Sequence, residues 1–572
     1  MTNSDIAAVF DQIADLLEFQ GANPFRIRAY RNGARTISDL TESVNQIIED
    51  EGRALTDLDG IGKDLAEKIT TLVETGSLPM LEELLEEIPE SVLAILRVPG
   101  LGPKRAAILY HELQITTLDQ LRAACEAGEV RGLKGFGAKT EEKILDGIDI
   151  AGEAEQRILW YTADQHVQAI LAHLRQCGAV EQFEVAGSYR RGKETVGDLD
   201  FLAVAKDSAA VMNHFATYPH LAGVIARGDT KMSIRLTGRL QVDLRVVPAE
   251  SFGAAMQYFT GSKNHNIVLR GMAKKQGLKI SEYGVFRGTK SIAGKTEEEV
   301  YAAMDLPCFP PELREARREF EWAEAGALPD LITLKDIRGD LHMHSTHSDG
   351  RATIEEMAAA AKRRGLKYIA MTEHSKRVSM ANGLDAKRLR RQFDEIDRLN
   401  ERLKGIKVLK GIECDILEKG GLDLDDDVLS EADWVLVSIH YGQKQSRNRI
   451  TRRAIEALEN PNVSAMAHPT GRLLLSRQPY DIDLDAVLET ARKRGKFMEL
   501  NAQPDRLDLD DVACAAAKRL GVPIVISTDA HSIEGLDFMR CGILQARRAG
   551  LTREDVANTR TWAQMRKMIG KK

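Results

Sequence analysis

The sequence predicts a multidomain protein in which three architectures follow one another: a helical N-terminal region, an α+β region and a C-terminal (β/α)7 barrel. Three observations support this prediction. Three glycine turns of one design each precede a helical pattern within the first 150 residues. Apolar strand candidates follow, some of which carry acidic residues. After residue 336, seven strand candidates alternate with helical patterns.

Length and composition define the general class of protein. A chain of 572 residues exceeds a single hydrophobic core, so several compact units are expected. Hydrophobic residues make up 43% of the chain, and no apolar run approaches the roughly 20 residues of a membrane helix. Residues 1–20 alternate acidic and apolar positions, which predicts an amphipathic helix rather than a signal peptide. We therefore expect a cytoplasmic protein with no membrane partner.

Cysteine usage supports the same compartment. The six cysteines are scattered without a C-x-x-C pair, at Cys125, Cys177, Cys308, Cys414, Cys514 and Cys541. This pattern fits a reducing compartment and argues against disulfides and thiolate zinc sites. We expect these residues to be thiols in the core.

The glycine turns of the helical region are Gly60-Ile61-Gly62, Gly100-Leu101-Gly102 and Gly135-Phe136-Gly137. Helical patterns follow them over residues 63–72, 103–113 and 138–148. Glycines allow such a turn to present successive amide hydrogens at a helix N-terminus, where a backbone phosphate can bind. A single turn of this kind could equally be a plain connector, but three at comparable spacing resemble the helix-hairpin-helix motif of DNA repair proteins. We expect Gly60, Gly62, Gly100 and Gly102 to lie at DNA contacts and leave the third turn open.

Acidic residues mark two strands of the α+β region, whose strand candidates cover residues 183–186, 199–204, 233–236 and 240–247. Asp198 and Asp200 share one face of a strand because alternate side chains point the same way. Asp243 lies between two apolar residues on another strand. Together these carboxylates could hold two Mg²⁺ ions about 4 Å apart for in-line phosphoryl transfer. An isolated D-x-D would more often be a solvated strand edge.

The turn before the D-x-D pair favours a catalytic site over a solvated strand edge. Gly187-Ser188 opens a helix with Arg191 in reach, which makes a phosphate clamp. Clamp and acids together resemble the nucleotidyltransferase fold of family X DNA polymerases such as polymerase beta. The resemblance implies a palm and a thumb domain, with DNA and dNTPs as substrates. It also implies one metal ion that activates the primer 3′-hydroxyl, with Asp243 placed to accept the proton, and a second that binds the triphosphate.

The resemblance extends past the palm. The segment Tyr258-Phe259-Thr260-Gly261-Ser262, followed by Asn266 and Arg270, looks like the family's sugar and base contacts, and residues 280–284 resemble the later part of its thumb. The family's nucleotide-binding positions fall on Gly187, Ser188, Arg191, Tyr258, Phe259, Gly261, Ser262 and Asn266. Ser188 and Arg191 would hold the triphosphate, and Tyr258 with Phe259 would guard the sugar. Asn266 would meet the minor-groove edge of the incoming base, and Arg270 would contact the template.

Two residues depart from the polymerase beta pattern. Gln241 stands where that protein has an arginine beside the third acid, and Lys263 stands where it has an aspartate. These departures bear on rate and fidelity rather than on the type of reaction.

The first helical module also resembles that of polymerase beta, which removes a 5′-deoxyribose phosphate through a Schiff-base lysine. Lys68 occupies the matching position, and Arg26 and Tyr30 match residues of the phosphate pocket. A nucleophilic lysine must be neutral, which requires burial or cationic neighbours. Here Thr56 and Asp64 replace two of the pocket's lysines, so lyase activity stays open beside 5′-phosphate binding, with a solvated helix lysine as the alternative.

The C-terminal region gathers histidines at strand ends. Seven of the thirteen histidines follow residue 336, and six of those seven follow or end apolar strand candidates. The eight candidate ligands at strand ends, with Asp349 as a ninth, are His342, His344, His374, Glu413, His440, His468, Asp529 and His531. Imidazoles and carboxylates without thiolates suit Mn²⁺, Zn²⁺ or Fe ions that activate water. A lone histidine of this kind would more often be structural, and His347 lies outside the pattern.

This set resembles the PHP phosphoesterase domain, which holds up to three metal ions and also occurs in bacterial family X and replicative polymerases. All nine ligand positions of the family are filled, which implies an active site. The resemblance implies a DNA substrate: 3′-terminal nucleotides, blocked 3′ ends or phosphates beside abasic sites. Arg472 and Arg506 are weaker candidates for gripping the substrate phosphate.

The net charge of −7 does not exclude a nucleic-acid enzyme. Backbone amides at helix starts can bind phosphates without basic side chains. Carboxylates that carry divalent metals add negative charge to the formula without repelling the substrate.

The predicted domains cover almost the whole chain. They are a helical lyase-type module at 1–90, a second helical DNA-binding module at 91–150, the palm at 151–249, the thumb at 250–315, a linker at 316–336 and the PHP domain at 337–572. We expect a monomeric DNA polymerase that fills gaps in repair, associated with the nucleoid, whose partner is gapped or nicked DNA with a 5′-phosphate. We further expect its PHP domain to be a 3′–5′ exonuclease or phosphoesterase, with AP-endonuclease or 3′-end processing as variants.

Two competing hypotheses remain. The PHP domain could be a small-molecule phosphatase or nuclease attached to an inactive, polymerase-like DNA-binding region. The whole chain could also be a non-catalytic repair scaffold. The intact Asp198, Asp200 and Asp243 argue against the first hypothesis.

Overall fold

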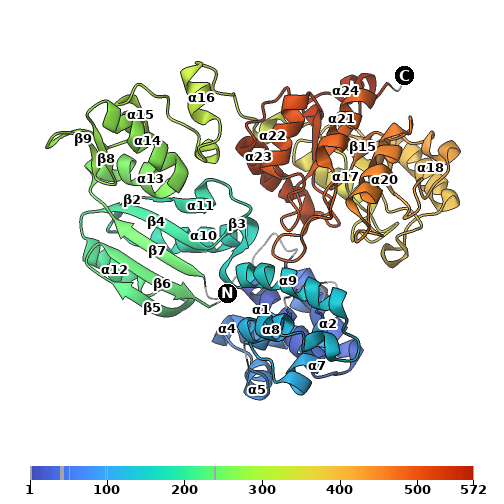
Figure 1. Cartoon of the computed structure of the whole chain (residues 1–572), viewed down its shortest axis with the longest axis horizontal. Helices are drawn as coiled ribbons and strands as arrows, with labels where there is room; N and C mark the ends of the chain where they lie inside the picture. Colours follow the sequence, from blue (N-terminus) through green and yellow to red (C-terminus); the bar gives the residue numbers. More distant parts are fainter. Residues whose placement is uncertain are drawn as a thin grey trace. The chain divides into compact units, whose positions relative to one another are not determined.

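The computed structural model describes residues 3–38, 44–49, 52–58, 60–89, 91–96, 98, 101–237 and 240–570. The chain divides into two compact units (Figure 1). The first comprises Met1–Arg190, Thr195–Cys308 and Leu475–Arg477, and the second comprises Arg191–Glu194, Phe309–Leu474 and Gln478–Lys572. None of the described helices is both long enough and apolar enough to cross a bilayer.

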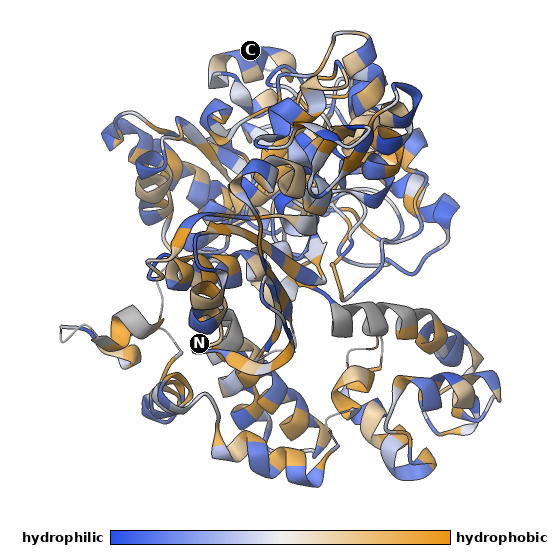
Figure 2. Cartoon of the chain, turned by 90° about the vertical axis from the view of Figure 1, so that its left-hand side faces the viewer, coloured by the Kyte–Doolittle hydropathy of each residue, from blue (hydrophilic) through white to orange (hydrophobic). Residues whose placement is uncertain are grey.

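Short helices make up the N-terminal region of the first unit, as predicted. They are α1 (Asn3–Phe19), α2 (Pro24–Ser38), α3 (Val44–Glu49), α4 (Lys63–Thr75), α5 (Pro79–Glu87), α6 (Val92–Leu96), α7 (Pro103–Leu113), α8 (Leu118–Glu126) and α9 (Ala138–Gln156), with 3₁₀ turns η1 (Leu55–Asp57) and η2 (Val130–Gly132). Phe10, Ile13 and Leu16 of α1 are fully buried, so the amphipathic pattern of residues 1–20 is confirmed. Hydrophobic and hydrophilic positions alternate around these helices in Figure 2.

The α+β region is a five-stranded sheet with the strand order β2-β4-β7-β6-β5. Its elements are β1 (Ile158–Leu159), α10 (Trp160–Leu174), β2 (Val180–Val185), α11 (Gly187–Arg190), β3 (Thr195–Val196), β4 (Asp198–Ala205), α12 (Ser208–Phe215), β5 (Leu221–Arg227), β6 (Lys231–Leu236) and β7 (Gln241–Val246). Strands β4 and β7 are parallel neighbours and the other pairs are antiparallel. The four predicted strands are confirmed. The sequence missed β5, an edge strand whose residues are mostly exposed.

Helices and a small antiparallel sheet follow the palm-like sheet. They are η3 (Ala249–Ser251), α13 (Phe252–Thr260), α14 (Lys263–Lys275), β8 (Lys279–Ser281), β9 (Gly284–Arg287), β10 (Lys290–Ala293) and α15 (Glu297–Ala302). The backbone of α13 lies directly against that of the segment before α15, because Gly253 and Ala254 donate to the carbonyls of Lys295 and Gly294. This contact fixes the start of the helix that carries Tyr258 and Phe259.

The segment expected as a linker is ordered within the second unit. η4 (Pro311–Leu313) precedes it, and the segment itself contains α16 (Glu319–Glu324) and η5 (Leu334–Asp336). Glu319 is 1% exposed and accepts hydrogen bonds from the amides of Ala316 and Arg317. The charged sequence looks like a linker, but these charges are used to cap backbone groups.

Seven parallel strands form the barrel of the second unit, in sequential order from β11 to β17. The strands are β11 (Gly339–Asp340), β12 (Tyr368–Met371), β13 (Lys407–Asp415), β14 (Trp434–Ser438), β15 (Ala465–Met466), β16 (Phe497–Asn501) and β17 (Ile524–Ser527). Met343 pairs with Ala530 in parallel and joins the first strand to the last, so the predicted (β/α)7 barrel is nearly closed. Its helices are α17 (Ile354–Arg363), α18 (Ala386–Arg402), α19 (Asp426–Leu429), α20 (Arg447–Glu459), α21 (Leu484–Arg494), α22 (Asp511–Leu520), α23 (Met539–Arg548) and α24 (Trp562–Met568), with η6 (Ser379–Ala381), η7 (Glu534–Phe538) and η8 (Ala557–Thr559).

Two apolar clusters fill the barrel. The larger packs the helices against the outer faces of the strands, and the smaller fills the interior with Leu409, Trp434 and Phe497. Met565 of α24 belongs to the interior cluster, which leaves the opposite, C-terminal ends of the strands for polar side chains. All six cysteines are free thiols, and all but Cys308 are buried, as expected for core residues.

Substitution of Gly253 tests the contact at the start of α13. A Cβ at this position would lie 2.1 Å from the carbonyl carbon of Thr296, and a backbone atom cannot move aside cheaply. We expect Gly253→Ala to lower the free energy of unfolding by about 3 kcal/mol, measured by thermal unfolding. Gly271→Ala in α14 is the matched control, because its Cβ would meet no described atom within 4 Å, and we expect it to be neutral or stabilising. Equal effects of the two changes would contradict the role given to this contact.

Candidate active sites

The three acids of the α+β region lie on one face of two neighbouring strands. Asp200 of β4 is directly opposite Asp243 of β7 in the parallel register, and Asp198 is opposite Gln241. Asp198 is exposed, Asp200 is partly buried and Asp243 is 8% exposed. The structure therefore brings together the carboxylates that the sequence predicts to hold a pair of divalent cations.

The electrostatics of this cluster suit cation binding. Burial, together with repulsion from Asp198 and Asp243, raises the pKa of Asp200 to about 7. Burial alone would also raise the pKa of Asp243, but hydrogen bonds from Gln241, Ser233 and Lys231 lower it. One acid is therefore unfavourable as an anion unless positive charge is supplied. Hard oxygen ligands in this arrangement fit Mg²⁺.

Two cationic side chains beside Asp243 were not predicted. Lys231 Nζ lies 3.0 Å from Asp243 Oδ2, and an Arg245 nitrogen lies 3.8 Å from the same oxygen. Arg245 also stacks on the ring of Phe259 at 4.5 Å. Lys231 is on β6, and only the pairing of β6 with β7 shows that it lies near the acid.

The turn at Gly187-Ser188 packs directly on the acids. Gly187 has a φ of +66°, and a Cβ there would lie 2.8 Å from Asp200 Oδ2, so only glycine fits. The amide of Ala186 donates to the carbonyl of Asp200 at 2.8 Å. Ser188 follows in the first turn of α11 and is partly exposed. The turn and the strand are thus locked together, with the serine beside the carboxylates.

The two arginines after Ser188 are already engaged. Arg191 belongs to the second unit, where its Nε lies 3.1 Å from Glu315 Oε1. Arg190, which the sequence analysis did not single out, donates to Thr260 Oγ1 and pairs with Glu297. A triphosphate contact by Arg191 requires loss of its ion pair and stays a prediction.

The predicted sugar and base contacts lie around the junction of α13 and α14. Tyr258 and Phe259 end α13, and Gly261 with a φ of +69° separates them from Ser262, the N-cap of α14. Arg270 is exposed and lies over the ring of Tyr258 at 5.0 Å. Asn266 is 9% exposed, and Lys263 is exposed on the first turn of α14. The residues that the resemblance assigns to the sugar and base of the nucleotide thus lie on two consecutive helices and the turn between them.

The glycine turns have the local structure that an anion cradle needs. Gly62, Gly102 and Gly137 are the N-caps of α4, α7 and α9, and Gly60 has a φ of +77°. Gly100 lies outside the described residues. These features support the helix-hairpin-helix interpretation, while individual DNA contacts stay predictions.

The lysine of the expected lyase pocket is paired with an acid. Lys68 forms an ion pair with Asp64, four residues earlier on α4. An ion pair engages the amine as an ammonium, whereas the nucleophile must be neutral. Tyr30 is 1% exposed and its hydroxyl donates to Met80 Sδ, to which Arg26 also reaches. The phosphate contact of Tyr30 and the lyase role of Lys68 stay predictions.

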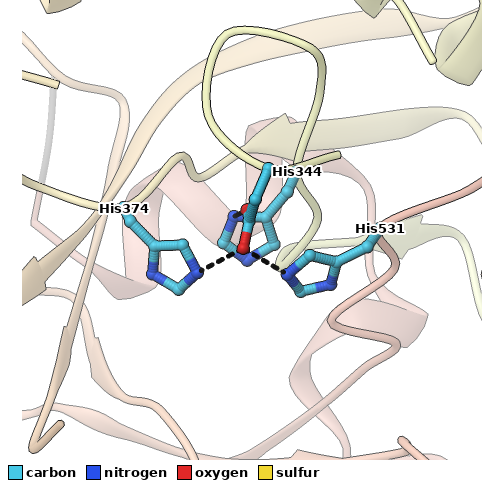
Figure 3. A group of neighbouring side chains, drawn as sticks. His344, His374 and His531 are labelled. Carbon is cyan, nitrogen blue, oxygen red and sulfur yellow. Dashed lines mark ion pairs between the residues drawn. The ribbon is translucent and has the colours of Figure 1, made fainter. Parts of the chain in front are cut away.

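The nine residues predicted as PHP ligands converge at the C-terminal ends of the barrel strands. Three overlapping groups could each hold an ion: His344, Asp349, His374 and His531; His342, His344 and Asp529; and His374, Glu413 and His440. In Figure 3 the imidazoles of His344, His374 and His531 surround one carboxylate. That carboxylate belongs to Asp349, whose oxygens lie 3.9, 3.6 and 3.5 Å from the three rings in this order.

Glu413 is the centre of the cluster. It is fully buried, and its oxygens lie 2.8 Å from His374 Nδ1, 2.8 Å from His468 Nε2 and 3.5 Å from His440 Nε2. The ninth residue, His468, thus approaches the site through this carboxylate. A carboxylate between several imidazoles has the geometry of a bridging ligand.

The protonation of this cluster indicates that it is built for cations. Burial lowers the pKa of His374, but Glu413 and Asp349 outweigh it and raise that pKa to about 10. Burial and the neighbouring His531 and His374 instead lower the pKa of His344 to about 3. In the part of the chain that the structure describes, the buried His342 Nε2 and His344 Nδ1 make no hydrogen bond. Ligand atoms left in this state fit Mn²⁺, Zn²⁺ or Fe.

Buried carboxylates orient the ligands, and the sequence analysis missed them. Glu499 accepts from His342 Nδ1 at 2.7 Å and from the amide of His468 at 2.6 Å, which leaves Nε2 of His342 for the site. Asp415 accepts from the amide and Nδ1 of His440 in the same way. A carboxylate behind a histidine ligand is a recurring feature of metal sites, so Asp415, two residues after the predicted ligand Glu413, could have been suspected, whereas Glu499 has no such neighbour in the sequence.

A further buried acid shapes the loop that carries Asp349. Glu373 accepts from the amide and hydroxyl of Ser345 and from the hydroxyl of Ser348. His347 in the same loop pairs with Glu395 at 3.0 Å and is not part of the ligand cluster.

Arg472 and Arg506, the two candidate phosphate contacts, differ in their surroundings. Arg472 donates to the carbonyls of Arg506 and Leu507 and pairs with Glu194, so it holds a loop together. Arg506 is partly exposed, and its Nε lies 3.7 Å from Asp529 Oδ2. Only Arg506 is placed at the metal ligands.

The fold and these two sites define a class of protein: a nucleotidyltransferase-like chain with a separate metal-dependent phosphoesterase barrel. Comparisons with protein families agree segment by segment. The matches are a helix-hairpin-helix domain at residues 1–78, a SAM-like helix-hairpin-helix tandem at 92–149, a DNA polymerase beta palm at 157–228, a DNA polymerase beta thumb at 255–315 and a PHP domain at 340–503.

Three relatives illustrate the range of similarity. The chain is 42% identical to the DNA polymerase/3'-5' exonuclease PolX of Bacillus subtilis (strain 168), over 98% of both chains. It is 32% identical to a probable phosphatase of Thermoanaerobacter sp. (strain X514), over 38% of this chain and 89% of that protein. It is 27% identical to DNA polymerase lambda of Rattus norvegicus, over 55% of this chain and 56% of that protein. The chain belongs to the family X DNA polymerases that carry helix-hairpin-helix regions, palm, thumb and a C-terminal PHP domain.

The raised pKa of Asp200 predicts how pH affects stability without metal. Its folded pKa of about 7 exceeds the ordinary 3.8, so the folded state loses stability as pH rises from about 4 through about 7. We expect Asp200→Asn, in the presence of a chelator, to be more stable than the unmodified protein by the order of 1–2 kcal/mol at about pH 8, with little difference near pH 4. Thermal unfolding at both pH values measures this.

Asp229→Asn is the control for this prediction, because it removes an exposed carboxylate from the same unit. A gain that is equal at both pH values, or equal in the control, would show that repulsion among the three acids is not its source.

Glu499 offers a test of ligand orientation in the barrel. Glu499→Gln removes the negative charge that fixes His342 and His468, and we expect the affinity for Mn²⁺ to fall about 10- to 100-fold. Titration of the metal-free protein with Mn²⁺ measures the change. Glu489→Gln, on the exposed face of α21 beside Lys493, should leave the affinity unaltered. Full affinity in Glu499→Gln would refute this role.

Proposed function

We propose that this chain is a DNA-directed DNA polymerase that fills short gaps during repair and whose PHP barrel is a metal-dependent 3′–5′ exonuclease. The single observation that carries the polymerase part is the register of β4 and β7, which sets Asp198, Asp200 and Asp243 on one face. Family membership supports it, because the Bacillus subtilis relative is named for both activities. Substrates are then gapped or nicked DNA and dNTPs.

The palm residues have separate tasks in this reaction. Mg²⁺ ions bound by the three acids would activate the primer 3′-hydroxyl and neutralise charge on the triphosphate. Hydrogen bonds from Gln241, Ser233 and Lys231 lower the pKa of Asp243, which keeps its carboxylate ionised as a metal ligand, and the same carboxylate would accept the hydroxyl proton. Ser188, on the turn locked against Asp200, is placed to hold the triphosphate. Tyr258 and Phe259 close the sugar side.

The barrel residues support hydrolysis of a phosphodiester. Mn²⁺, Zn²⁺ or Fe bound by the nine ligands would supply an activated water and stabilise charge on phosphorus. Two acids would hold the histidines around a single active site. They are Asp349, on a loop fixed by Glu373, and Glu413, at the centre of the cluster. Arg506 is the side chain placed to grip the substrate phosphate. The 3′-terminal nucleotide of DNA is the proposed substrate.

A second activity is favoured for the same barrel. Its likeness to probable phosphatases supports removal of phosphate from blocked 3′ ends, which would prepare a primer for extension. Both reactions use one metal-activated water and differ in the leaving group.

Separation of the two activities tests the proposal. We expect Asp198→Ala to lower dNTP incorporation on one-nucleotide gapped DNA by roughly 10³-fold while sparing 3′–5′ degradation, because each site loses only its own metal ligand. We expect His342→Ala to do the reverse. Incorporation is measured with Mg²⁺ and degradation of a labelled single strand with Mn²⁺.

Matched controls are Asp229→Ala and His347→Ala, which remove an exposed acid and a histidine outside the ligand cluster. Both should retain both activities. Loss of both activities in either test variant would mean that the two sites do not act independently. An unmodified protein that fails to incorporate dNTPs would refute the polymerase.

A further inference from the structure

Asn266 is locked by hydrogen bonds from inside the protein. Gln257 Nε2 donates to Asn266 Oδ1 at 2.7 Å, and Asn266 Nδ2 donates to the carbonyl of Tyr258 at 2.8 Å. Both residues are buried, with Gln257 1% and Asn266 9% exposed. The lock joins the last turns of α13 to the first turn of α14.

Burial of a polar side chain at position 257 is unfavourable, and the neighbouring buried residues are apolar. Phe252, Ala254, Ala255 and Met256 of α13 are buried and apolar. Burial of an unpaired amide is unfavourable by about 1–3 kcal/mol, and a leucine would fill the same space without that cost. The bond to Asn266 is therefore the physical reason for a glutamine here.

The two bonds fix which end of the Asn266 amide faces which partner. In the flipped orientation, Nδ2 would meet the donor of Gln257 and Oδ1 would meet the carbonyl of Tyr258. Both contacts would then be repulsive, so a single orientation is allowed. Nδ2 carries two hydrogens, of which the Tyr258 carbonyl takes one. The second N–H is left as a donor.

A fixed donor at this place suits a base edge. In the minor groove, adenine N3 and thymine O2 are acceptors at corresponding positions, so a single donor can read correct pair geometry without reading sequence. We propose that Gln257 is a positioning residue that holds the Asn266 amide with its nitrogen toward the minor-groove edge of the incoming nucleotide, and thereby sets nucleotide selection. This inference rests on the proposed polymerase function.

Nucleotides with and without the acceptor test it. The probes are dATP and 3-deaza-dATP opposite template thymine on gapped DNA, and the readout is the ratio of their kcat/KM values. We expect the unmodified protein to favour dATP about tenfold, the worth of one hydrogen bond. Asn266→Ala should reduce the ratio to about one, and Gln257→Leu should reduce it toward the same value, mainly through KM for dATP.

Two further variants separate positioning from folding. Gln257→Glu keeps the size of the side chain but cannot donate to Oδ1, so it should lose the preference even if Gln257→Leu does not fold. Met256→Leu, a volume-conserving change at the adjacent buried position, should keep the preference. The double variant Gln257→Leu/Asn266→Ala should show no loss of the ratio beyond that of Asn266→Ala.

The outcomes are distinct. A protein that incorporates neither nucleotide contradicts the proposed function itself. Incorporation with no preference in the unmodified protein overturns the inference, because Asn266 then makes no such contact. The inference is also overturned if Gln257→Leu and Gln257→Glu lower kcat/KM equally for both nucleotides and leave the ratio intact. A glutamine with a merely structural role would give that result.

Discussion

Burial of ionisable ligand side chains is the constraint on which both sites depend. In the palm, the register of β4 and β7 sets Asp200 opposite Asp243, and burial, together with repulsion from Asp198 and Asp243, raises the pKa of Asp200 to about 7. In the barrel, burial alone would raise the pKa values of Glu413 and Asp529, but the neighbouring imidazoles hold both well below the ordinary range. Neither arrangement is stable as a set of bare anions, because burial penalises charge that is not compensated. The scaffold must therefore hold the ligands in place before a cation binds, which the nearly closed barrel and the glycine turn at Gly187 support.

The parts that the sequence predicted are those with a short repeat. The period-2 pattern identified the strands with the acids, and polar residues after apolar strands identified the barrel ligands, because the carboxyl ends of parallel strands meet at one edge. Glycine-to-helix turns were equally local, and Gly62, Gly102 and Gly137 are indeed N-caps. These features needed no knowledge of which strands pair.

The parts that the sequence missed depend on long-range pairing. Glu499 contacts His342 across 157 positions, and Lys231 reaches Asp243 only because β6 pairs with β7. The edge strand β5 lacks a buried face and so lacks a pattern. The charged segment at 316–336 looked like a linker, because composition does not reveal that Glu319 caps backbone amides. Residues that orient others are hardest to find, since their chemistry is the same whether they serve a site or the solvent.

The two sites differ in the chemistry of their ligand atoms, and this difference bears directly on which metal each site suits. Three carboxylates offer only hard oxygen atoms, which suit Mg²⁺, and the barrel's six histidines favour borderline metals that bind imidazole nitrogen. The two ligand sets therefore differ in the metals that they suit, so neither site would have to serve both reactions. In the proposed function, synthesis and degradation of a DNA end would take place at different clusters, so the cluster that the end reaches, rather than a switch within either site, would decide the reaction.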